Sequence, residues 1–265
     1  MADLFFPQLS SGAMAQFPFS KRRTLRTIQN LLGDGSMFLS SDPNAARNTW
    51  VLGLDGLSSA DIQAIQAHFT ACLGPLRAFT FLDPSDNMLK FSSDLTNPVW
   101  TVSPDIQIAQ RVADPFGGST AFVVTNSGQI PETIGQTMLV PANYQYCLSV
   151  YVRGSGSSSL TLKRRGTADS ASISFACRTS WNRIVSTGRL NDAGTTLTIE
   201  IQLQPGETLQ ICGPQLEPQV EPSRYRPTAS RCGVYRNAHW ASNQLWISAD
   251  APGSFATSLT IESAL

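Results

Sequence analysis

Short stretches that alternate between apolar and polar side chains follow one another along much of the chain. The clearest is 144–153, where Tyr, Leu and Val occupy the even positions and mostly polar residues the odd ones. Residues 197–203 alternate in the same way. A period of two places the apolar set on one face of a β-strand. Turn signals rich in Gly, Pro, Asn and Asp separate such stretches throughout 90–227, which predicts an antiparallel β jelly roll.

The first 89 residues predict strands and one helix. A hairpin is expected from the stretches 24–28 and 36–40 around Gly33-Asp34-Gly35, and further strands at 50–54 and 76–82. Ser58 or Ser59 is a suitable helix N-cap. The helix presents one apolar stripe and ends at Gly74-Pro75; the stripe consists of Ile62, Ile65, Phe69 and Cys72.

The last segment, 228–265, offers two strands, 244–249 and 254–262, separated by a turn. Two strands without a helix cannot bury a core alone, so they must complete another segment. We therefore expect a mainly β protein. Residues 1–89 and 228–265 would form a split β-sandwich-type domain with one helix, and 90–227 an inserted jelly-roll domain.

Charge restricts the class of partner. The chain has 19 basic and 19 acidic residues, and charged residues make up only 14% of it. A zero net charge argues against nucleic acid, whose phosphates require a basic excess. The N-terminus lacks the pattern of a signal peptide, and no run of 18 apolar residues occurs, so we expect synthesis in a cytoplasm and no membrane insertion.

Metal, cofactor and nucleophile signals are weak. The five cysteines are widely spaced without a CxxC pair, which favours buried thiols over a zinc site or a disulfide framework. Neither of the two histidines, His68 and His239, belongs to a catalytic motif. Asp83, Asp86 and Asn87 could ligate calcium, but a capped turn explains them better. No cofactor is expected.

Acidic residues in the middle segment allow an enzymatic alternative, and they are Glu132, Glu200, Glu207, Glu217 and Glu221. Two carboxylates facing each other across a groove could hydrolyse a glycosidic bond. Scattered surface acids account for the same residues, and we favour that interpretation and a non-enzymatic protein.

Aromatic and arginine side chains are the candidate ligand contacts. Sugars stack on aromatic rings while Arg bonds their hydroxyls, and Tyr151 with Arg153 shares the polar face of its strand. Trp181 and Arg183 share a face of the next such strand. Alternatively, Trp181 is a core anchor and Tyr151 an ordinary half-exposed sheet residue.

A basic run at 21–26 is the main local charge excess. Arg22 and Arg26 would share one face of a strand. They are candidates for a contact between subunits or with an anionic partner. A solvated edge that discourages aggregation is an equally good interpretation.

Two sets of residues carry a family resemblance. The opening Phe6-Pro7-Gln8-Leu9-Ser10-Ser11-Gly12-Ala13, and the helix leading to Phe79-Thr80-Phe81-Leu82-Asp83-Pro84, resemble the distal tail proteins of long-tailed phages and gene transfer agents. The closing stretch 252–263 fits the last strand of that domain. In the middle segment, Gly213-Pro214-Gln215-Leu216-Glu217 and Ser223-Arg224-Tyr225-Arg226-Pro227-Thr228 resemble jelly-roll modules of carbohydrate-binding type found in phage tails.

The resemblance implies a structural role at the tail tip of a virion. Such proteins form a hexameric ring that joins the tail tube to the host-recognition hub. The insert would point outward and contact host glycans or other tip proteins. The alternatives are a polysaccharide-degrading enzyme and a stand-alone glycan-binding adhesin.

Overall fold

The computed structural model describes residues 3–264, without the side chains of residues 43 and 110. It is mainly β with antiparallel sheets and one α-helix, which confirms the expected fold class. The chain divides into two compact units, residues 1–81 with 235–265, and 82–234. From the sequence we expected the boundaries between residues 89 and 90 and between residues 227 and 228. The observed boundaries differ by several residues, because residues 83–92 form hydrogen bonds with the last part of the second unit. Met88 N–H donates to Leu216 O (2.9 Å) and Phe91 N–H to Ala229 O (2.9 Å).

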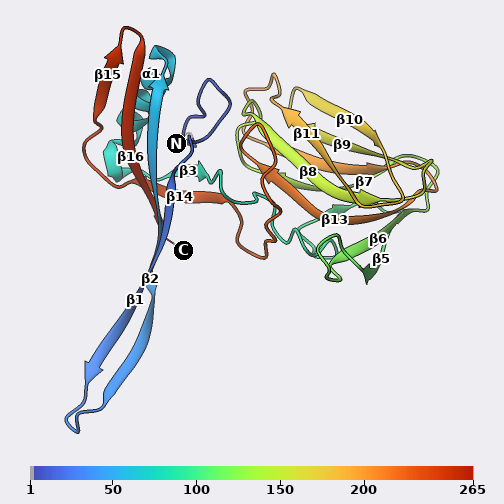
Figure 1. The fold of residues 1–265 in the computed structure, drawn as a ribbon, viewed down its shortest axis with the longest axis horizontal. Coiled ribbons are helices and arrows are strands. Elements are labelled where there is room, and N and C mark those ends of the chain that lie inside the picture. The colour runs from blue at the N-terminus through green and yellow to red at the C-terminus, as the bar shows by residue number, and fades with distance from the viewer. Residues whose placement is uncertain (1–2, 265) are drawn as a thin grey trace. The chain divides into compact units, whose positions relative to one another are not determined.

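The split unit contains one six-stranded sheet in the order β1-β2-β16-β14-β3, with β15 pairing β16 (Figure 1). Its strands are β1 Ser20–Leu31, β2 Met37–Leu57, β3 Phe79–Leu82, β14 Val234–Trp240, β15 Ile247–Ala251 and β16 Ser254–Ala264. The C-terminal strand β16 is therefore paired with β2 on one side and β14 on the other. A single sheet with a helix replaces the two facing sheets that strand counting suggested for this unit.

Helix α1, Ser59–Cys72, begins and ends as its sequence predicts. Ser58 is the N-cap, and it forms a capping box with Asp61 in which each side chain accepts from the other's backbone N–H. Leu73 ends the helix in the left-handed conformation, and the 3-10 turn η1, Gly74–Leu76, follows. The expected strand 76–82 is thus shortened to β3.

The core of the split unit is aromatic. Trp50, Phe6, Phe79, Phe81 and Trp240 are each 3% exposed or less. Their rings contact one another at centroid distances of 5.1 to 6.2 Å, as in the pairs Trp50–Phe81 and Phe6–Phe79. The core thus joins residues from both ends of the chain.

β1 and the first part of β2 continue beyond the rest of the sheet as a two-stranded arm (Figure 1). All twelve residues of β1 are exposed. The register shifts between Thr24 and Arg26, where residues 43–46 of β2 stand opposite Leu25. The two expected strands at 36–40 and 50–54 are thus parts of one long bent strand.

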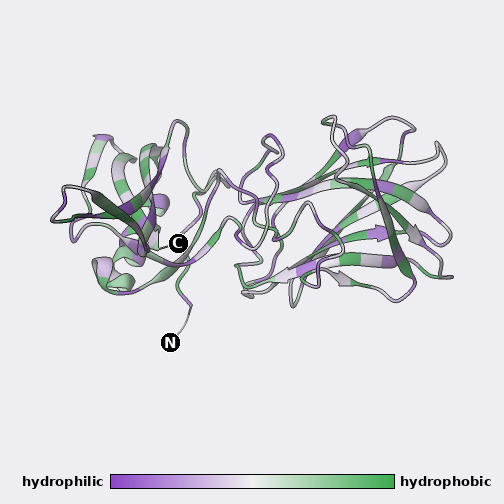
Figure 2. Cartoon of the chain, turned by 90° about the horizontal axis from the view of Figure 1, so that it is seen from below, coloured by the Kyte–Doolittle hydropathy of each residue, from purple (hydrophilic) through white to green (hydrophobic). Residues whose placement is uncertain are grey.

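The second unit is a jelly roll of two five-stranded antiparallel sheets, ordered β10-β9-β12-β7-β4 and β11-β8-β13-β6-β5. The alternating stretches of the sequence form its core, because Leu148, Val150, Leu162, Ile199 and Ile201 are fully buried. Figure 2 shows the resulting alternation of hydrophobic and hydrophilic residues along the strands. The strands are β4 Thr101–Val102, β5 Ile106–Val112, β6 Ala121–Asn126, β7 Glu132–Met138, β8 Tyr146–Arg153, β9 Ser159–Arg165, β10 Ser170–Ala176, β11 Asn182–Gly188, β12 Leu197–Leu203 and β13 Thr208–Glu217.

Four thiols lie in these cores, those of Cys72, Cys147, Cys177 and Cys212, and none of the four forms a disulfide. Burial raises the pKa of Cys147 to about 12 and those of Cys177 and Cys212 to about 11. These thiols therefore stay protonated and poorly nucleophilic at neutral pH. Within residues 3–264, no helix is both long enough and apolar enough to cross a membrane.

His68 is a core residue of the split unit. Its Nδ1 accepts from Trp240 Nε1–H at 3.2 Å, and its ring meets Phe79 edge-on at 4.7 Å. Burial lowers the pKa of His68 to about 4. The neutral ring is therefore part of the folded state.

We predict that the split unit loses stability in mild acid. Below about pH 6.5 the unfolded chain binds a proton that folded His68 does not, so the free energy of unfolding should fall by about 2–3 kcal/mol between pH 7 and pH 4.5. Amide exchange of α1, corrected for intrinsic rates, measures this change. His68→Gln keeps an acceptor for Trp240 but does not titrate, so the fall should disappear. An equal fall in both proteins would contradict the assignment.

Candidate functional site

A row of four side chains crosses the face of the second unit's β11-β8-β13-β6-β5 sheet that points away from the core. Gln210 of β13 stands opposite Arg153 of β8 and Val123 of β6. Trp181 directly precedes β11, whose first residue pairs with Val152. Alternation therefore places Trp181, Arg153, Gln210 and Val123 side by side across four strands.

Arg153 is the central residue of this row. Its guanidinium lies 4.9 Å from the centre of the Trp181 ring, and its Nε–H donates to Gln210 Oε1 at 2.6 Å. A hollow of about 340 Å³ adjoins it. The hollow is lined by Val123, Arg153, Gly154, Ser155, Thr179, Thr208 and Gln210. Trp181 and Arg153 are both half-buried, so the pair is accessible to a ligand.

Arg183 and Tyr151 form a second pair in the neighbouring row. They stand opposite each other in the register, and the guanidinium lies 5.3 Å from the ring centre. Arg183 also donates to Ser223 O at 2.6 Å and to Ser149 Oγ at 2.9 Å. The predicted pairs are therefore exchanged: Arg153 lies over the ring of Trp181, and Arg183 lies over the ring of Tyr151. Arg183 also holds segment 218–226 against the sheet through its bond to Ser223 O.

Further aromatic rings cover the same end of this face. Phe116 stacks on Tyr225 at 5.7 Å and meets Tyr151 edge-on at 5.0 Å. Phe116 is nevertheless 50% exposed. Its loop is held by Asp114, which accepts four hydrogen bonds from Phe116, Gly118 and Thr120. Burial alone would raise the pKa of Asp114, but these bonds outweigh it and lower the value to about 2.

Several acids that allowed a hydrolytic alternative have structural contacts. Glu207 accepts from the backbone N–H groups of Ser159 and Gln204, at 2.7 and 3.0 Å. Glu217 is fully buried and accepts from Ser223 Oγ–H at 2.5 Å. Glu200 pairs with Arg165 at 2.9 Å. These bonds account for the three carboxylates without a substrate.

The Asp83-Pro84-Ser85-Asp86-Asn87 cluster is a capped turn in the structure. Asp83 Oδ1 accepts from Ser85 N–H at 2.8 Å, and Asp86 Oδ1 accepts from Asn87 N–H at 2.9 Å. Asn87 is buried and donates to Pro214 O at 3.0 Å. Among residues 3–264, no group of three or more His, Cys, Asp or Glu side chains is placed to hold a metal ion.

Arg22 and Arg26 lie on β1, on opposite sides of the register shift at Thr24. Arg26 forms an ion pair with Asp42 across the arm, and Arg22 is exposed. One residue of the predicted pair thus has a partner within its own hairpin.

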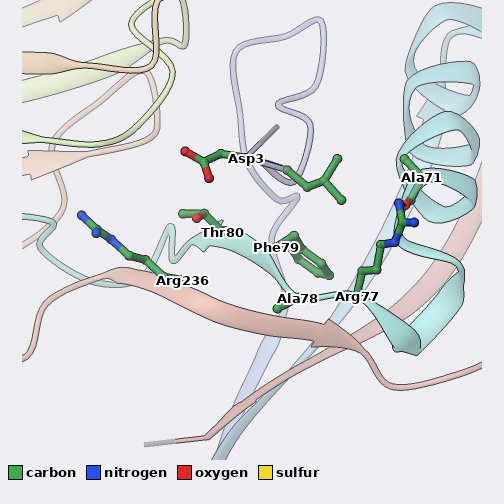
Figure 3. A pocket seen from close by; sticks show the side chains of 8 residues that line it. Asp3, Ala71, Arg77, Ala78, Phe79, Thr80 and Arg236 are labelled. Atoms are coloured by element: carbon green, nitrogen blue, oxygen red, sulfur yellow. The ribbon is translucent and has the colours of Figure 1, made fainter. Parts of the chain in front are cut away.

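A second hollow, of about 540 Å³, lies in the split unit. Figure 3 shows Arg77 and Arg236 at its opposite ends, with Phe79 and Thr80 between them. Arg77 Nη1–H donates to Ala71 O at 3.2 Å near the end of α1, a structural use of the guanidinium. The backbone of Thr80 is paired with Leu4 and Phe6.

Sequence reasoning found Tyr151, Arg153, Trp181 and Arg183 but missed Gln210 and Phe116. Gln210 is the polar residue between the buried Leu209 and Ile211, so alternation alone could have placed it on the face of its strand that points away from the core. Its position beside Arg153 depends on the pairing of β13 with β8, which no local pattern reveals. Phe116 lay in a turn signal and carried no periodicity.

Comparisons with known proteins concern the fold. No protein-family model matches the sequence, and no curated protein matches it. The structure is similar to the enzymatically active domain of bacteriophage CBA120 tailspike protein 4, with 14% identity and a TM-score of 0.40 over 52% of this chain. The matched part spans 22% of that tailspike chain.

The structure is also similar to carbohydrate-binding modules, with sequence identities and TM-scores close to those of the tailspike domain. The CBM22-1 xylan-binding domain of Paenibacillus barcinonensis Xyn10C is 15% identical, with a TM-score of 0.42, and the match covers 53% of this chain and 99% of that domain. The family 11 module of Clostridium thermocellum is 12% identical, with a TM-score of 0.37, covering 52% and 98%.

We predict that the two arginines differ in their effect on stability. Arg183→Ala leaves the fully buried Ser149 hydroxyl without this donor, so the second unit should lose about 2–3 kcal/mol of unfolding free energy. Arg153→Ala removes one bond at a half-exposed site and should cost about 1 kcal/mol or less. Urea unfolding of the full chain, followed by amide exchange of β8, checks the order. Equal losses would contradict it.

Proposed function

We propose that the protein is a non-enzymatic structural subunit of a virion tail tip. Copies of the split unit would assemble as a ring, with six members as the expected number, between the tail tube and the tail-tip hub. The inserted jelly roll would face outward and contact host glycan or another tip protein. The observation that carries this proposal is the arm formed by β1 and β2.

The arm exposes apolar side chains that the described residues of its own unit leave largely uncovered. Leu31 and Met37 are paired at the tip and are 76% and 60% exposed. Phe38 and Leu39 are 55% and 56% exposed. Adjacent strand positions point to opposite faces, so both faces of the arm carry apolar residues. A lone two-stranded hairpin is marginally stable in water and requires a partner surface.

A ring of copies provides such a surface for every arm. In a head-to-tail arrangement each arm meets the neighbouring subunit, and rotation closes the set without leaving one arm uncovered. Trp246, elsewhere on the same unit, is 74% exposed and offers a second apolar contact. Low charge density is consistent with a surface that is largely buried on assembly.

The inserted unit supplies the outward contact in this proposal. Its accessible row of Trp181, Arg153 and Gln210 combines an aromatic ring with hydrogen-bond donors. Several such sites on one ring gain by multivalency, so the affinity of a single site can be low. A host-binding role therefore needs no catalytic step.

We predict that the arm controls oligomerisation. Replacing Leu31 and Met37 together by Ser should weaken self-association by about 100-fold or more, since buried apolar anchors dominate interface energy. The matched control replaces Gln29 and Asn30 by Ser on the same arm, and it should sediment as the wild type does. Sedimentation velocity over a concentration series measures both. Equal behaviour of the two variants would contradict the role of the arm.

Electron microscopy of particles that contain this chain tests its location. The expected density is a closed ring at the end of the tail tube, labelled by an antibody against residues 90–227. A chain absent from the tail would overturn the proposal. Release of reducing ends from host polysaccharide by the pure protein would favour the hydrolytic alternative instead.

A further inference from the structure

We infer that the hollow beside Arg153 binds an acidic glycan through a sugar carboxylate. This inference rests on the proposed glycan contact of the inserted unit and names the class of its ligand.

The hollow is rich in donors. Arg153 Nε–H is used by Gln210 Oε1, but among residues 3–264 its two terminal amino groups make no hydrogen bond. A guanidinium nitrogen can only donate, so the contact fixes the Gln210 amide with its oxygen toward Arg153. Gln210 Nε2 is therefore a further donor. The hydroxyls of Ser155, Thr179 and Thr208 complete the polar lining, and those of Ser155 and Thr208 are already bonded to Ser158 Oγ at 2.6 Å and Thr125 Oγ1 at 2.9 Å.

Among the side chains that the structure describes, the lining contains no Asp or Glu that would neutralise Arg153. Glu207, the residue before Thr208, is already bonded to two backbone N–H groups. Arg178 lies near the rim, since its carbonyl accepts from Gly154 N–H at 2.8 Å, and its side chain is exposed. Sugar hydroxyls can use the same donors, but a carboxylate also brings the opposite charge to Arg153, and hydrogen bonds between charged groups are the stronger ones.

The guanidinium is also positioned before the ligand arrives. Arg153 Cζ lies over the Trp181 ring, 4.9 Å from its centre, and Gln210 holds the Nε–H, so the unbonded edge is the pair of terminal amino groups. Two parallel N–H groups match the two oxygens of a carboxylate. Little side-chain entropy is then lost on binding, because rotamers are already restricted.

Calorimetric titration of the full chain with trigalacturonic acid tests the inference against its methyl ester, which has the same shape without the charge. The acid should bind at least about tenfold more tightly, and salt should weaken it. Arg153→Gln should remove this preference. The matched control, Arg178→Gln, removes the same charge near the rim and should retain it. Thermal unfolding of both variants verifies that the unit stays folded.

The titrations distinguish three results that would contradict the inference. Equal binding of the acid and the ester overturns the acidic ligand but leaves a glycan contact. A sulfated trisaccharide that binds more tightly than the carboxylate overturns the assignment to carboxylate. No binding of any of the three overturns this inference, and the ring of the proposed function is then judged by sedimentation and microscopy alone. Sedimentation of the same samples reports assembly separately, since Arg153→Gln lies outside the arm.

Discussion

The split unit depends on the pairing of β16 with β2. β16 lies between β2 and β14, and its register runs from Phe255 opposite Leu57 to Ala264 opposite Arg47. This pairing brings both ends of the chain into one sheet. It also places Ile261 beside Trp50, so the sheet and the aromatic core close together. Without β16, β2 would keep only β1 as a neighbour, and the base of the arm would have no sheet to extend from.

The inserted unit depends on a different constraint, the pairing of Arg183 with the segment that returns over the sheet. Tyr225 packs against Gly213, where an added Cβ would meet the ring at 3.1 Å. Gly213 also has φ +58°, a conformation that side chains other than glycine rarely adopt. The ring of Tyr225 thus covers the sheet face at Gly213, whereas the hollow beside Arg153 is open.

Period-two patterns and helix caps predicted the elements whose cause is local. Residues 146–153, most of the predicted stretch 144–153, and residues 197–203 form core strands, and Ser58 caps α1. β14 was not predicted, because Val234–Trp240 mixes apolar and polar residues without alternation and gains its place only by pairing with β16. The arm was predicted only as a short hairpin around Gly33-Asp34-Gly35, because the stretches 36–40 and 50–54 were predicted as separate strands. For the candidate site, the side-chain types were evident from the sequence, but the place of Gln210 beside Arg153 follows from strand register.

The position of β16 in the sheet also determines the order in which the two units can fold during synthesis. During synthesis, β2 and the whole of residues 82–234 leave the ribosome before β16 exists, so the inserted unit can fold first. The sheet that supports the arm closes only when the last strand arrives. The sheet at the base of the arm is therefore completed only after the whole of residues 82–234 has been synthesised.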